Sequence, residues 1–189
     1  GYSVFSTVFS VEWQGRKLNF IDCPGSDDFI GGAVSALSVT DTAVIVLNAQ
    51  YGVEVGTINH FRYTEKLSKP VIFVVNQLDQ EKADYDNVLA QLKDRYGNKV
   101  VPIQYPVVCG SGFNQVVDVL KMKLYRWKPE GGVPEVLDIP DEEMDKAMEF
   151  HQALVEASAE NDESLMEKFF EQGTLTEDEM REGIRQGLL

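Results

Sequence analysis

The spacing of hydrophobic residues changes several times along this chain, and each change predicts a different element. Residues 2–13 alternate loosely and are rich in β-branched and aromatic side chains, a composition typical of a strand. Gln14 and Gly15 then form a predicted tight turn, and Lys17–Asp22 is the predicted returning strand. The first part of the chain is therefore expected to be a β-hairpin.

Strands and helices alternate over the next part of the chain. Continuous apolar runs over Thr42–Leu47 and Pro70–Val75 predict strands buried on both faces, and residues 100–108 predict a further strand. Helical spacing is found over Phe29–Val39, Val53–Leu67 and Ala83–Tyr96. This alternation predicts an α/β fold with a mostly parallel sheet, in which ligands bind beyond the carboxyl ends of the strands.

The pattern changes after Gly110-Ser111-Gly112. Residues 116–127 are strand-like, and residues 129–140 hold the prolines and glycines of a loop. Three helices should follow, over 141–160, over 162–170, and after a capping box at Thr176–Glu179. The apolar side of the first of these helices is expected to comprise Met144, Met148, His151, Val155 and Ala159. We therefore expect two domains, residues 1–112 and a mainly helical part over 113–189.

Charge is distributed very unevenly. The net charge is −14, but residues 1–128 carry 13 acidic and 13 basic side chains, whereas residues 129–189 carry 18 acidic and 4 basic ones. An excess of acidic side chains repels phosphates, which argues against direct nucleic-acid binding by residues 129–189. It fits either a basic protein partner or a solvated helical surface. No apolar run reaches the roughly 18 residues that a membrane-spanning helix needs.

Two short motifs stand at the ends of predicted strands. Asp22-Cys23-Pro24-Gly25 follows the hairpin, and Asn76-Gln77-Leu78-Asp79 follows the second buried run. A D-x-x-G turn and an N-x-x-D turn in this order resemble the third and fourth nucleotide-binding motifs of GTPases. Either motif alone occurs by chance in many chains, whereas the pair at strand ends is more specific. Each residue also has an ordinary structural alternative, since Asp22 could cap its turn and Asn76 and Asp79 could be turn formers.

The resemblance extends over nearly the whole chain. Residues 1–4 and 18–25 resemble the Arg-Gly-Ile-Thr-Ile and Asp-Thr-Pro-Gly-His stretches of translational GTPases. Residues 113–127 are similar to the opening of the inserted G′ subdomain of elongation factor G, and residues 143–189 resemble the helices of that insert. The chain thus resembles a divergent elongation factor G paralogue. The resemblance implies part of a P-loop-NTPase-type G domain over 1–112, followed by an α+β G′ insert over 113–189.

That family implies ligands and site residues. GTP or GDP and Mg²⁺ would be bound in the intact protein, with Asp22 holding Mg²⁺ through water, Gly25 meeting the γ-phosphate and Asp79 recognising guanine. The ribosome, including its large-subunit stalk protein, would be the partner, in the cytoplasm. The implied nucleotide-binding residues are Asp22, Pro24, Gly25, Asn76, Gln77 and Asp79, and the implied metal ligands are Ser3 and Asp22.

Three positions depart from the family pattern. Ser26 stands where the family has the histidine that positions the attacking water, Gln77 where it has lysine, and Ser3 where it has threonine. A serine hydroxyl lacks the reach of imidazole, so Ser26 is either a weak catalytic group or an ordinary loop residue. Ser3 keeps the hydroxyl that can ligate Mg²⁺.

Two nucleotide-binding motifs of the family are missing from the chain. It has no G-x-x-x-x-G-K-[ST] sequence, which the family places before residue 1, and the fifth motif would follow the insert. Cys109–Gly112 superficially resembles the fifth motif, although a connecting loop is favoured. The strand missing between Lys17–Asp22 and Thr42–Leu47 should leave apolar faces exposed. Alone, this segment should bind nucleotide weakly and hydrolyse none.

Three functions remain open from sequence. The first is part of a GTPase that promotes translocation on the ribosome. The second, suggested by Ser26 and Gln77, is a GTP-binding paralogue that is impaired in hydrolysis and serves as a ribosome-binding module. The third is an interaction module that uses only the acidic residues 129–189, whose binding to a basic partner would be sensitive to salt.

Overall fold

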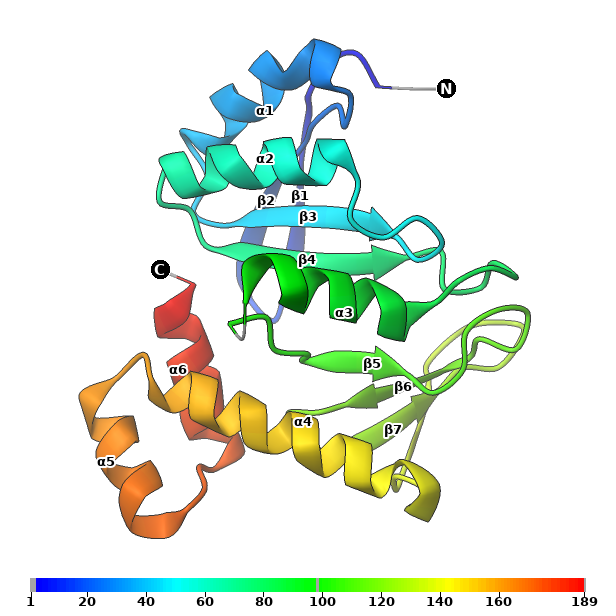
Figure 1. The fold of residues 1–189 in the computed structure, drawn as a ribbon, viewed down its shortest axis with the longest axis vertical. Helices are drawn as coiled ribbons and strands as arrows, with labels where there is room; N and C mark the ends of the chain where they lie inside the picture. Colours follow the sequence, from blue (N-terminus) through cyan, green and yellow to red (C-terminus); the bar gives the residue numbers. More distant parts are fainter. Residues whose placement is uncertain (1–2, 98, 189) are drawn as a thin grey trace. The chain divides into compact units, whose positions relative to one another are not determined.

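The computed structural model describes residues 3–97 and 99–188, and it has the predicted α/β character (Figure 1). The chain divides into two compact units. The first contains the residues up to 45 and residues 53–74, and the second contains residues 46–52 and the residues from 75 onward. The predicted boundary between residues 112 and 113 is a different kind of division and stays a prediction.

The first unit opens with the predicted hairpin. Strands β1 (Thr7–Trp13) and β2 (Arg16–Asp22) are antiparallel, with Thr7 opposite Asp22 and Trp13 opposite Arg16. The two turn residues, Gln14 and Gly15, both have positive φ angles, of 49° and 73°. Such angles are those of a two-residue type I′ turn, whose twist matches that of the flanking strands. The strand begins at Thr7, later than predicted, and residue 2 lies outside the described residues.

Three helical segments of the first unit, one of them a 3₁₀ helix, follow the hairpin in the chain. A short 3₁₀ helix, η1 (Asp27–Phe29), leads directly into α1 (Ile30–Leu37), and α2 (Val55–Lys66) packs against α1. The side chain of Asn59 on α2 donates a hydrogen bond of 2.9 Å to Asp27 Oδ2. The segment that follows β2 is therefore tied to α2 by a polar contact.

Strands β3 (Ala43–Asn48) and β4 (Val71–Asn76) form a second two-stranded sheet, and the division between units falls within both. The amide of Ala43 donates to Pro70 O and the amide of Ala49 donates to Asn76 O, so the strands run in the same direction. This agrees with the predicted parallel sheet.

The prediction that β3 is buried on both faces is wrong. Leu47 is buried, whereas Val44 and Val46 are 53% and 60% exposed. Successive side chains of a strand point to opposite faces, and in this structure one face of β3 is uncovered. β2 and β3, expected to flank a further strand, belong to separate sheets, which agrees with the expected exposure of apolar faces.

The first helix of the second unit is α3 (Tyr85–Tyr96), whose predicted apolar face of Val88, Leu89 and Leu92 is buried. A four-stranded antiparallel sheet follows in the order β5-β6-β7-β8. Its strands are β5 (Gln104–Pro106), β6 (Gln115–Asp118), β7 (Lys123–Arg126) and β8 (Glu135–Leu137).

This sheet corrects three predictions about its strands. The strand expected over 100–108 is only three residues long, and the strand-like stretch 116–127 is two strands joined by a turn. Met122 in that turn has a φ of 51°, which a continuous strand could not accommodate. The expected loop over 129–140 contains β8, whose Leu137 pairs with Leu124.

Three helices close the second unit, namely α4 (Asp141–Ala159), α5 (Glu163–Gln172) and α6 (Glu177–Gly187). The predicted capping box is present, with the Thr176 hydroxyl and the Glu179 carboxylate each bonded to the other's backbone amide. Asp162 caps α5 by accepting from the amides of Ser164 and Leu165.

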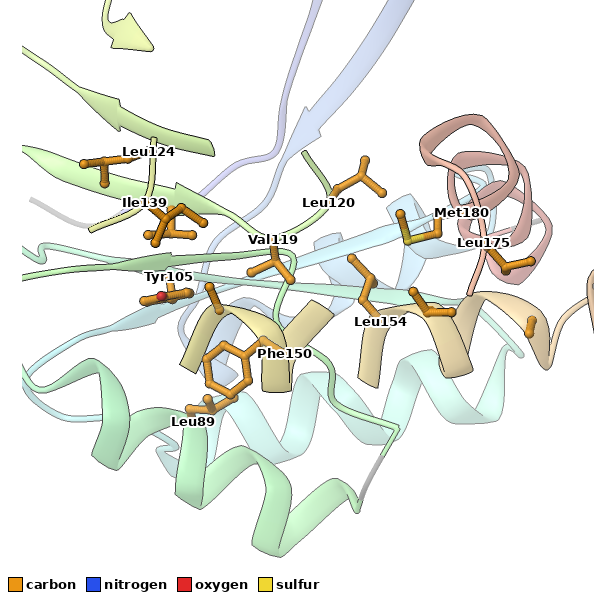
Figure 2. Close-up of a cluster of buried hydrophobic side chains, with 14 of the residues drawn as sticks. Leu89, Tyr105, Val119, Leu120, Leu124, Ile139, Phe150, Leu154, Leu175 and Met180 are labelled. Atoms are coloured by element: carbon orange, nitrogen blue, oxygen red, sulfur yellow. The ribbon is translucent and has the colours of Figure 1, made fainter. Parts of the chain in front are cut away.

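The core of this unit lies between α4 and the four-stranded sheet (Figure 2). Phe150 on α4 lies between Tyr105 of β5 and Leu89 of α3, and its ring meets that of Tyr105 edge-on with centroids 5.4 Å apart. The predicted apolar side of α4 is wrong in part, because Met148 is 58% exposed while Phe150 and Leu154 are buried. No helix in the described ranges combines the length and the apolar character needed to cross a bilayer.

Candidate functional site

The predicted site residues fall into two groups, one in each unit. The D-x-x-G turn, Asp22–Gly25, lies in the first unit with Ser3 and Ser26. The N-x-x-D turn, Asn76–Asp79, lies in the second.

Asp22 is the last residue of β2, and its side chain is exposed. Within residues 3–97 and 99–188, its carboxylate accepts no hydrogen bond and forms no ion pair. The structural alternative, that Asp22 caps the following turn, therefore has no hydrogen bond to support it. A free, exposed carboxylate is the type of oxygen ligand that Mg²⁺ uses either directly or through water.

The rest of the D-x-x-G turn is anchored by its middle residues. Pro24 is fully buried, and Cys23 is half-buried with its Sγ 3.6 Å from the Ile21 carbonyl oxygen. The Ser6 hydroxyl donates to the same sulfur at 3.6 Å. Gly25, by contrast, is exposed and has no neighbouring atom within 4 Å of where a β-carbon would stand. The turn thus has a fixed base and an open tip, as close approach of a phosphate to the Gly25 amide would require.

Ser26 lies directly after this tip and precedes η1. Its carbonyl accepts from the Phe29 amide at 3.0 Å, but its hydroxyl makes no capping hydrogen bond. Ser3 lies in the exposed, irregular segment before β1. No hydrogen bond within the described ranges joins Ser3 to Asp22.

The N-x-x-D turn is held at the end of β4 by several hydrogen bonds. The Asn76 carbonyl accepts from the Ala49 amide at 2.9 Å, and Asn76 Oδ1 accepts from the Gln77 amide at 2.9 Å. Gln77 has a φ of 61°, a left-handed conformation that non-glycine residues adopt infrequently. Asp79 is exposed, and the Gln80 side chain donates to its Oδ2 at 3.2 Å.

Two further segments support this turn. The amide of Gly110 donates to Leu78 O at 2.8 Å, so the 109–112 loop lies beside the N-x-x-D turn. The side chain of Asn48, the last residue of β3, donates from Nδ2 to Gln77 Oε1 at 2.5 Å. Asn48 belongs to neither of the two sequence motifs. The signal that could have found it is an amide at the carboxyl end of the strand that neighbours β4.

Metal binding at this site would rely on few protein ligands. Across the described ranges, no group of three or more His, Cys, Asp or Glu side chains is placed to hold a metal ion. Mg²⁺ commonly keeps several waters and uses one or two protein oxygens together with phosphate oxygens. The hard oxygen donors of Asp22 and Ser3 fit that chemistry, whereas they would not form a closed metal site by themselves.

Comparison with known proteins gives a consistent result. The sequence profile of the family described as "Elongation factor Tu GTP binding domain" matches residues 1–171. A relative described as "Elongation factor G-like protein" from Thermotoga maritima is 35% identical over 187 residues, covering 99% of this chain and 26% of the relative. A crystal structure of a protein from Thermus thermophilus superposes with a TM-score of 0.86 at 31% identity, covering 100% of this chain and 28% of that one. The chain thus spans about a quarter of the length of these relatives.

Proposed function

The chain belongs to the elongation factor Tu GTP-binding-domain family and, within it, to translational GTPases of the elongation factor G type, and from this we propose that its full-length protein binds and hydrolyses GTP on the ribosome to promote translocation. The observation that carries this proposal is the pair of turns, Asp22–Gly25 and Asn76–Asp79, at strand ends within a family match over residues 1–171.

Each turn would have a distinct task. Bound Mg²⁺ would supply positive charge against the phosphate oxygens, and the oxygens of Asp22 and Ser3 are the ligands offered to it. The Gly25 amide would donate to the γ-phosphate from the open tip of its turn. Pro24 would hold this turn in place through its burial.

Guanine would be recognised by the second turn. The Asp79 carboxylate is exposed and can accept from both the N1–H and the exocyclic amine of guanine. Asn76 uses its Oδ1 to hold the backbone of Gln77, so its main contribution would be to fix the shape of the turn. If Asp79 contacts the base and Asn76 shapes the turn, Asp79 should determine the preference for guanine.

The partners follow from the same assignment. We propose that residues 113–189 form the G′ insert and that their acidic helices contact the large-subunit stalk protein, with the ribosome as the overall binding platform in the cytoplasm. The excess negative charge of residues 129–189 supports a basic partner surface for these helices.

A second candidate function is favoured by Ser26. Its hydroxyl makes no capping bond and is short, so it is poorly suited to orient an attacking water. The full-length protein would then bind GTP, dock on the ribosome and hydrolyse slowly. It would serve as a nucleotide-dependent binding module and not as an efficient GTPase.

One experiment separates these candidates. GTP hydrolysis by the full-length protein is measured with and without ribosomes, beside an ordinary elongation factor G and an Asp79→Asn variant as the nucleotide-recognition control. A ribosome-stimulated rate near that of the ordinary factor supports the GTPase. A background rate with retained, GTP-dependent ribosome binding supports the binding module, and loss of both GTP and ribosome binding refutes both. Asp79→Asn should weaken GTP binding at least tenfold, because the asparagine amide keeps only one acceptor oxygen and its NH₂ group would face one of the two guanine donors.

A further inference from the structure

The side chain of Asn48 is held by a backbone donor on one side. Its Oδ1 accepts from the amide of Gln50 at 2.7 Å, while its carbonyl accepts from the Gly52 amide at 2.9 Å. A backbone N–H can only donate, so the oxygen of the Asn48 amide must face it. The Nδ2 end is thereby directed to Gln77, where it donates to Oε1 at 2.5 Å.

This arrangement fixes the orientation of the Gln77 amide as well. Because Asn48 Nδ2 is a donor, Gln77 must offer its oxygen to Asn48, and its Nε2 group becomes the outward end of the side chain. Within the ranges that the structure describes, no hydrogen bond reaches Gln77 Nε2. Two N–H donors are therefore available to a ligand at an exposed position of the N-x-x-D turn.

The backbone beneath this side chain is fixed by the same pair of strand ends. Gln77 is kept in its left-handed conformation by the bond from its own amide to Asn76 Oδ1. The Ala49 amide, one residue beyond Asn48, donates to the Asn76 carbonyl. The donors of Gln77 are thus set in place before any ligand arrives, which reduces the entropy lost on binding.

We propose that Asn48 is a positioning residue for nucleotide binding: by holding Gln77 Oε1, it orients the Gln77 amide so that Nε2 donates to an acceptor atom of a bound guanine nucleotide. The inference rests on the proposed function and deepens it. Gln77, although neutral, would donate a hydrogen bond to the nucleotide from the position where the family has a cationic lysine. Asn48 acts on the nucleotide through Gln77 and does not itself touch it.

An Asn48→Asp variant tests this assignment. The carboxylate still accepts from the Gln50 amide, so the local turn is kept. The carboxylate cannot donate, however, so the Gln77 amide must rotate until its Nε2 donates to the new aspartate. The Oε1 atom of Gln77 then faces the nucleotide in place of Nε2. The dissociation constant of the full-length protein for fluorescently labelled GDP should rise roughly three- to tenfold, about the value of one hydrogen bond, with an unchanged thermal midpoint. If Asn48 only shaped the turn, the affinity would not change.

Asn48→Asp also adds a negative charge, and its direct effect on GDP binding is measured by making the same substitution in a Gln77→Ala variant. Gln77→Ala alone should weaken GDP binding roughly three- to tenfold, and adding Asn48→Asp to it should change affinity by less than about twofold. Normal GDP affinity of the Asn48→Asp variant, or a full loss repeated in the Gln77→Ala background, overturns the inference. A wild-type protein that binds no GDP overturns the proposed function itself, and the inference with it, which is a distinguishable result.

Discussion

Gly183 on α6 lies so close to Ser158 on α4 that a β-carbon at position 183 would overlap the Ser158 carbonyl oxygen. Ser158 is itself buried, and its hydroxyl donates to Leu154 O at 2.6 Å. The obstacle is therefore backbone within a packed helix, which cannot move aside as a flexible side chain could. Gly183 sets how closely the two helices approach.

Replacing Gly183 with alanine should separate these helices. The expected cost is about 1–3 kcal/mol in the free energy of local opening, the usual range for overpacking a core. Hydrogen exchange of the α4 and α6 amides in the full-length protein measures it. Gly31→Ala in α1 is the matched control, because open space surrounds that position, and it should stabilise α1 by roughly 0.5–1 kcal/mol. Unchanged exchange in the Gly183→Ala variant would contradict the close contact.

Lys146 on α4 makes two different kinds of contact, an ion pair with α3 and a cation–π contact with β5. Its Nζ lies 2.8 Å from Asp86 Oδ1 and 5.0 Å from the centroid of the Tyr105 ring. The Asp86 side chain is mostly exposed, so its ion pair should contribute little, whereas the partly buried ammonium over an aromatic ring contributes more.

Two variants should therefore differ in cost. Lys146→Met should lower the free energy of opening of α4 by about 1–2 kcal/mol, and Asp86→Asn by less than about 0.5 kcal/mol. Native-state proteolysis of the full-length protein supplies both values. Equal losses in the two variants would show that the ion pair, and not the ring contact, is the dominant interaction.

Acid should loosen the α5–α6 region. The Lys168 ammonium and the amide and hydroxyl of Thr176 lower the pKa of Glu179 to about 2, from an ordinary value of 4.5. The Ser164 hydroxyl, the Gln186 amide and the Leu165 backbone amide likewise lower the pKa of Asp162 to about 2. A carboxylate whose pKa is lower in the folded state stabilises that state fully above its unfolded pKa. The contribution is then lost as pH falls through the folded pKa.

The pH window follows from these values. The structure around Met180 should weaken between about pH 4.5 and pH 2, which the methyl NMR signal of this buried residue can report. Glu179→Gln should be less stable than the wild type at pH 7 and should show a shallower decline on acidification. An identical acid profile in both proteins would mean that Glu179 does not contribute to the loss.

Sequence reasoning worked where the information was local. The Gln14–Gly15 turn and the Thr176 capping box are encoded by adjacent residues, and both are present. β8 was missed because its pairing with β7 outweighs the loop-like prolines and glycines around it. Burial of β3 depends on what covers each face, which its own apolar run does not encode.

The candidate site shows the same limit. Both turns were found from their motifs and lie at strand ends as predicted, although their nucleotide roles remain predictions. Asn48 was missed because its partner, Gln77, is 29 residues away and is reached only once β3 and β4 lie side by side. The prediction of the buried side of α4 was wrong in part because this helix packs against both the sheet and α6. Phe150 and Leu154 are therefore buried, whereas Met148 is exposed.

The last prediction concerns the position after the D-x-x-G turn. Ser26→His in the full-length protein should raise ribosome-stimulated GTP hydrolysis at least tenfold, because an imidazole can reach and orient a water that the serine hydroxyl cannot. The change should leave η1 intact, since the Ser26 hydroxyl makes no capping hydrogen bond and only its carbonyl supports the helix. Ser26→Ala is the control and should hydrolyse GTP at the wild-type rate. No increase in the histidine variant, with GTP and ribosome binding retained, would mean that Ser26 does not limit hydrolysis and that the cause lies in another residue of the nucleotide site.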